Sequence, residues 1–148
     1  MEQYGPDPEK ADLLALSPSL RGSLTIHRAL PFTAAVERMH EPGVLVVTQP
    51  EWFSRQVPTK LYDYLCTGNP ILVLAPEDST TWKLASRFER CYQADPEDVP
   101  GIARVLEEIE GLKNEGMLTQ VSAVEDTEFL SKAAIRREFL DYVKRISR

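Results

Sequence analysis

The residues with the clearest chemistry lie together, directly after a proline. Thr59 and Lys60 follow Pro58, and Asp63 comes three residues after the lysine. Proline is favoured at the start of a helix because the N–H that it lacks would have no partner there. The free N–H groups of a first helical turn, here those of Thr59 and Lys60, attract anions such as a diphosphate. The spacing therefore predicts an anion site at the start of a helix over 59–67.

Lys60 and Asp63 carry the charges of this predicted site. A cation in the first helical turn opposes the helix dipole, at a cost of a few tenths of a kcal/mol to about 1 kcal/mol. A bound anion would reverse that sign, so Lys60 is a candidate for stabilising negative charge. Asp63 shares a helix face with Lys60, and its carboxylate can accept hydrogen bonds from two hydroxyl groups. The alternative is an ordinary surface ion pair worth about 0.3 kcal/mol.

The polar loop before this helix adds further candidates. Arg55 could contact a phosphate, although an arginine in a polar loop is more often only solvated. Trp52 and Phe53 could stack on a base or a sugar, or they could pack beneath the loop.

Strand patterns and helix patterns alternate along the chain. Such alternation implies a parallel sheet with helices on both faces, so the predicted fold class is α/β. Ser79 is a plausible N-cap, and Gly68 is a plausible helix stop. The predicted strands cover 23–28, 44–47, 71–75 and 90–94. The predicted helices cover 10–16, 31–40, 59–67, 79–88 and 128–146, and a further long helix opens at 95–96. The apolar residues of this long helix that are spaced for a core face are Ile102, Val105, Leu106 and Ile109.

Composition excludes several classes of function. The 148 residues suit one domain, and a net charge of −6 argues against nonspecific binding to nucleic acid. No apolar run approaches the roughly 20 residues of a membrane span, and the polar N-terminus does not resemble a secretion signal. A cytoplasmic location is therefore expected. The two cysteines and two histidines have no metal-ligand spacing, so no metal site is expected.

The segment from Pro58 to Pro70, P-x-K-x-x-D-Y-x-x-x-G-x-P, resembles the donor-binding segment of GT-B glycosyltransferases, specifically the group 1 or family 4-like enzymes. The resemblance implies a partial doubly wound, Rossmann-like parallel sheet, as in the C-terminal half of such an enzyme. It implies a hexosyltransferase-like activity on a UDP- or GDP-linked sugar, with no separate cofactor. The implied donor-binding residues are Arg55, Pro58, Thr59, Lys60 and Asp63.

The resemblance also implies roles for single residues. Lys60 would be the catalytic group, because it would stabilise the departing diphosphate. Asp63 stands where the family usually has glutamate, and it would hold the ribose hydroxyls. Arg55 stands where many members have a second acidic residue, so this chain departs from the family's pattern there.

The resemblance further suggests how much of an enzyme is present. Tyr4–Pro8 resembles a turn that follows the first β-α-β unit of the family's second domain. Residues 1–148 are therefore expected to form one partial donor domain without the acceptor-binding domain, inactive by itself.

Two rival functions remain open. The chain could be an interaction module that forms homo-oligomers through exposed apolar surface. It could also be a GT-B relative with epimerase chemistry on a UDP-sugar, which would need a general base near Lys60. His27 and His40 are both distant from Lys60 in sequence.

Overall fold

The computed structural model describes residues 2–5, 25–118, 127, 130–131 and 137. The chain divides into two compact units, Met1–Met39 and His40–Arg148, each of which is described by itself. The expectation of a single domain over 1–148 stays a prediction. The helix predicted over 10–16 lies outside the described residues, as does most of the helix predicted over 128–146.

In the described residues of the first unit, the elements are a short pair of parallel strands and one helix. β1 (Glu2–Gly5) pairs in parallel with β2 (Thr25–Arg28). α2 (Phe32–Met39) follows β2. β2 and α2 lie within the strand predicted over 23–28 and the helix predicted over 31–40, and they confirm both.

The turn predicted at Tyr4–Pro8 is wrong for its first two residues. Tyr4 and Gly5 belong to β1, where they lie opposite His27 and Arg28 of β2. Glycine followed by proline is a strong local turn signal, but strand pairing depends on a segment far along the chain. A four-residue strand without alternating apolar side chains has no local pattern that would reveal it.

The second unit is built on a three-stranded parallel sheet with the order β3-β4-β5. The strands are β3 (Leu45–Thr48), β4 (Ile71–Leu74) and β5 (Cys91–Ala94). The helices among its described residues are the short η2 (Glu51–Phe53), α3 (Thr59–Leu65), α4 (Thr80–Ala85) and α5 (Val99–Asn114). This arrangement confirms the α/β class and is compatible with part of a Rossmann-like sheet.

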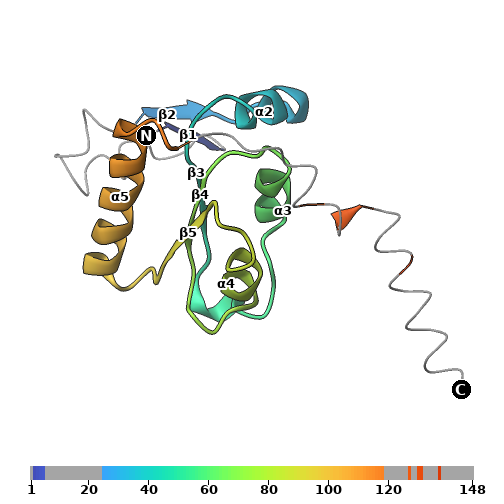
Figure 1. The fold of residues 1–148 in the computed structure, drawn as a ribbon. Helices are drawn as coiled ribbons and strands as arrows, with labels where there is room; N and C mark the ends of the chain where they lie inside the picture. Colours follow the sequence, from blue (N-terminus) through green and yellow to red (C-terminus); the bar gives the residue numbers. More distant parts are fainter. Residues whose placement is uncertain (1, 6–24, 119–126, 128–129, 132–136, 138–148) are drawn as a thin grey trace, which may run out of the picture. The chain divides into compact units, whose positions relative to one another are not determined.

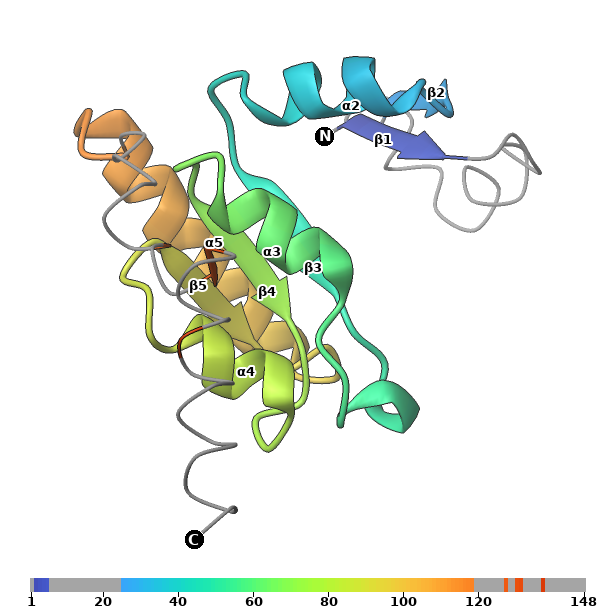
Figure 2. The same ribbon diagram turned by 90° about the vertical axis from the view of Figure 1, so that its right-hand side faces the viewer.

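Helices cover both faces of this sheet (Figures 1 and 2). α3 and α4 lie on one face, and α5 lies on the other. Successive strands are neighbours in the order β3-β4-β5, so right-handed crossovers place both connecting helices on the same side. α5 follows the last strand and takes the opposite face.

The core lies between the sheet and the α3/α4 layer. Leu61 and Leu65 of α3 pack with Ile71 and Val73 of β4, and all four are fully buried. Burying each such side chain contributes roughly 1.5–3 kcal/mol to folding. β4 is the central strand, which explains why its sequence is continuously apolar rather than alternating. The other members of the buried cluster are Val47, Ala75, Ala85, Phe88 and Cys91.

α5 differs from its prediction in both position and buried face. It begins at Val99 rather than at 95–96, and it continues to Asn114 through a weakly patterned stretch. Ile109 is buried as predicted, but Leu106 is 49% exposed. Gly101 is buried instead, so the face that packs on the sheet is rotated away from Leu106.

Candidate functional site

Two loops meet at the carboxyl edge of the sheet. The segment from Gln49 to Pro58 follows β3, and the segment from Ala75 to Ser79 follows β4. Because β3 and β4 are parallel, both segments start at the same edge. The first segment is held to the start of α4, which directly follows the second segment, since the Thr80 N–H donates to the Ser54 carbonyl oxygen at 2.8 Å. Ligands of open α/β sheets bind at this edge, so the geometry favours a site here.

The loop after β3 contains a short helical turn that displays large side chains. η2 is closed by the Ser54 N–H, which donates to the Glu51 carbonyl at 3.0 Å. Trp52 is 82% exposed and lies edge-on to Phe53, with ring centroids 5.3 Å apart. Residues 51–56 line an open hollow of about 370 Å³.

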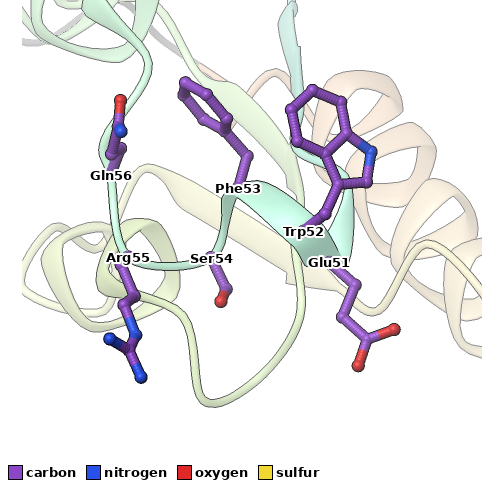
Figure 3. Close-up of a pocket in the computed structure, with 6 residues that line it drawn as sticks. All are labelled: Glu51, Trp52, Phe53, Ser54, Arg55 and Gln56. Carbon is purple, nitrogen blue, oxygen red and sulfur yellow. The ribbon is translucent and has the colours of Figure 1, made fainter.

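Arg55 and the two aromatic rings point to different sides of this loop (Figure 3). The Trp52 and Phe53 rings lie on one side of the ribbon, and the Arg55 guanidinium lies on the other. A phosphate held by Arg55 would therefore not share its position with a base stacked on Trp52. The stacking role considered from the sequence stays a prediction.

Pro58 precedes the first turn of α3 rather than forming part of it. It is the N-cap residue, with φ −57° and ψ 132°, and its carbonyl accepts from the Leu61 N–H at 2.9 Å. Thr59 and Lys60 occupy the first turn as predicted. The helix ends at Leu65, two residues before the predicted end at 67.

The side chains expected to bind the donor are on the surface. Thr59, Lys60 and Asp63 are exposed on α3, and Arg55 is exposed in the preceding loop. Among the residues that the structure describes, no ion pair or hydrogen bond joins Lys60 to Asp63. The surface ion pair considered as the alternative is therefore not formed within the described part of the chain. The structure brings the three helix residues together, and it records no contact between them and Arg55 in the same described part.

The second half of the Pro58–Pro70 segment is structural. Residues 67–70 are buried, and Gly68 has a φ of +75° that glycine adopts without strain. The Thr67 hydroxyl donates to the Tyr64 carbonyl at 2.7 Å and accepts from the Asn69 N–H at 3.1 Å. The Asn69 Nδ2 donates to the Glu41 carbonyl at 2.9 Å. These bonds fasten the end of α3, so its exposed first turn has a defined position.

Gln49 is a residue of this site that the sequence analysis missed. It is 2% exposed, and its Nε2 donates to the Phe53 carbonyl at 3.0 Å and to the Gln56 carbonyl. The Gln56 carbonyl also accepts from the Thr81 hydroxyl at 3.2 Å. The only available signal was a glutamine directly after a buried strand, and local sequence does not say which carbonyls it would reach.

Three groups of the second unit have raised pKa values, and one of them, Tyr64, lies directly beside Asp63. Burial, and then the neighbouring Asp63 carboxylate, raise the pKa of Tyr64. Burial, and then Glu108, raise the pKa of Tyr92. Burial raises the pKa of Cys91 to about 11, although Arg90 opposes the shift. All three shifts move away from neutral pH, so none of these groups is tuned for proton transfer there.

Within the described part of the chain, no three His, Cys, Asp or Glu side chains lie close enough together to hold a metal ion. The described helices are also too short or too polar to cross a membrane. A comparison with protein-family models, with curated proteins and with solved structures finds no significant match to this chain.

Proposed function

We propose that the unit His40–Arg148 is the nucleotide-sugar-binding portion of a GT-B glycosyltransferase, with a UDP- or GDP-linked sugar as donor. The observation that carries the proposal is the division of the Pro58–Pro70 segment. Its last four residues, 67–70, are buried, while Lys60 and Asp63 near its start are exposed and form no bond to each other in the described structure. This division supports a binding role for the first turn of α3.

The chemistry follows from the position of these groups. The N–H groups of Thr59 and Lys60 and the Lys60 ammonium would stabilise the negative charge on the departing diphosphate, without a metal ion. Asp63 would accept hydrogen bonds from the ribose hydroxyls, since a carboxylate has acceptor sites for both. Arg55 would contact a phosphate from the loop at the carboxyl edge of the sheet. The chain by itself would bind the donor but not transfer the sugar.

The test is an amide nitrogen–proton NMR titration of the chain with UDP and with GDP. One of the two nucleotides should shift the resonances of Thr59, Lys60 and Asp63. Lys60→Glu should abolish these shifts. Lys113→Glu is the matched control, because it makes the same charge change at the far end of α5, which begins at the carboxyl edge and runs away from it (Figure 1).

Each outcome of the titration decides the proposal. Dispersed spectra that neither nucleotide perturbs would overturn it. Equal loss of binding in both lysine variants would also overturn it, since the effect would then come from net charge and not from the site.

A second candidate, an interaction module, is favoured by a different observation. Several large apolar side chains of the second unit are exposed, among them Trp52 at 82% and Val99 at 71%. β3 is also an edge strand of the described three-stranded sheet. Sedimentation equilibrium distinguishes the two candidates: an interaction module should self-associate, and Lys60→Glu should leave that association unchanged.

A further inference from the structure

Gln49 is buried at the point where β3 passes into the loop. Its backbone N–H donates to the Leu74 carbonyl of β4 at 2.8 Å, which extends the strand pairing by one residue. Its side chain turns into the loop and donates both bonds from Nε2, one to the Phe53 carbonyl and one to the Gln56 carbonyl. A single carboxamide thus joins the end of β3 to two later points of the same loop.

These two carbonyls bracket the only cation of the loop. Arg55 lies between Phe53 and Gln56 in sequence, so the backbone on either side of it is held by Gln49. Two residues of α4 bind the same stretch. The Thr80 N–H donates to the Ser54 carbonyl, and the Thr81 hydroxyl donates to the Gln56 carbonyl. The exposed guanidinium therefore projects from a backbone that is fixed on both sides.

The buried position of Gln49 is unfavourable for one of its side-chain atoms. The Gln49 Oε1 atom is buried and has no hydrogen-bond donor among the described residues. An unpaired buried acceptor is unfavourable, and an apolar side chain of similar size would avoid it. Holding the loop is thus the role that the Gln49 geometry supports, rather than filling space in the core.

We infer that Gln49 is a positioning residue, which holds the loop over 50–57 in one conformation and so places Arg55 for the ligand. The holding of the loop depends only on the contacts described above. The consequence for the ligand rests on the proposed function, in which Arg55 meets a phosphate of the nucleotide.

The rate of trypsin cleavage at the Arg55–Gln56 bond of the full-length chain reports how often the loop opens. Gln49→Met keeps the size of the side chain and removes both donors. Gln93→Met is the matched control, since Gln93 also donates to a carbonyl, that of Trp82 at 2.9 Å, but has no bond to this loop. Cleavage after Arg55, followed by mass spectrometry, should accelerate at least about 10-fold in Gln49→Met and less than about twofold in Gln93→Met. Equal rates in the two variants would overturn the inference.

The ligand measurement separates this inference from the proposed function. Affinity for UDP or GDP should fall at least about fivefold in Gln49→Met and stay within about twofold in Gln93→Met. Faster cleavage with unchanged affinity would contradict the placement of Arg55 for a phosphate. If the unmodified chain binds neither nucleotide, the proposed function fails, and the cleavage rates still decide whether Gln49 holds the loop.

A measurement on the unmodified chain covers the case in which Gln49→Met does not fold. The side-chain amide protons of Gln49 should exchange with water at least about 10-fold more slowly than those of Gln56, whose side chain is exposed. Equal exchange rates would show that the Gln49 carboxamide is not held, and the inference would be wrong.

Discussion

The Nη2 atom of Arg90 donates to the carbonyl oxygen of Leu65 across 2.7 Å, and thereby joins the start of β5 to the last turn of α3. Arg90 is only 7% exposed, and its guanidinium also lies over the Phe88 ring at 5.3 Å. A cation at a helix C-terminus is favourable, because the last carbonyls carry partial negative charge. The helix that presents Lys60 and Asp63 is therefore anchored at its far end by a charged side chain.

Replacing Arg90 should destabilise the second unit. Arg90→Met should lower the free energy of unfolding by about 1–3 kcal/mol, because the buried Leu65 carbonyl loses its charged donor. Urea denaturation followed by circular dichroism measures the change. Arg104→Met is the control, since Arg104 forms an exposed pair with Asp98 at 3.4 Å and should change stability by less than about 1 kcal/mol. Equal losses in the two variants would refute the anchoring role.

Two glycines at the end of α5 should respond to alanine with opposite signs. Gly111 lies inside the helix, and Gly116 follows it with a φ of +71°. Among the described residues, a Cβ atom would meet nothing within 4 Å at either position, so no crowding by them opposes the substitution. Gly111→Ala should raise the free energy of unfolding by about 0.5–1 kcal/mol, because alanine favours helix. Gly116→Ala should lower it by about 1–2 kcal/mol, because alanine is strained at positive φ. Urea midpoints of the two variants that move in the same direction would contradict this account.

Cys91 should make stability fall at alkaline pH. Burial raises the pKa of its thiol from 9.0 to about 11, so the folded chain keeps a proton that the unfolded chain loses in this interval. The contribution of the protonated Cys91 thiol to the free energy of unfolding is fully present below pH 9 and is lost as the pH rises toward 11. The stability difference between the unmodified chain and Cys91→Ala should therefore be smaller at pH 10.5 than at pH 8. If the free energies of unfolding of the two proteins change in parallel with pH, ionisation of the thiol does not affect stability.

Ser79 should stabilise α4 through its side chain. The Ser79 Oγ accepts from the Trp82 N–H at 3.0 Å, which confirms the predicted N-cap. Ser79→Ala should cost about 0.5–2 kcal/mol of unfolding free energy. Ser86→Ala is the control at the other end of α4, where the hydroxyl is exposed and its loss should cost less than about 0.5 kcal/mol. Thermal unfolding of both variants measures the difference, and a larger loss for Ser86→Ala would contradict the capping role.

From β3 to α5, the order of strands and helices followed from the sequence by itself, apart from the short η2, which was predicted as loop. Continuous apolar runs predicted β3 and β4, and Gly68 and Ser79 predicted an end and a start of helices. These signals are local, because a cap residue, a glycine at positive φ and a run of apolar residues can each be recognised from neighbouring residues. Local patterns were less reliable for α5, where Leu106 has the spacing of a core residue but lies exposed. The buried face of a helix is chosen by the sheet that it packs on.

Only the tertiary structure decided how the candidate site is divided. The Pro58–Pro70 segment reads as one motif, yet Thr67 and Asn69 are buried and bonded while Lys60 and Asp63 are exposed. The role of Gln49 was equally hidden, since its two acceptor carbonyls belong to residues brought near it by the path of the loop. Burial and side-chain hydrogen bonds depend on contacts between segments distant in sequence, and periodicity along one segment does not contain that information.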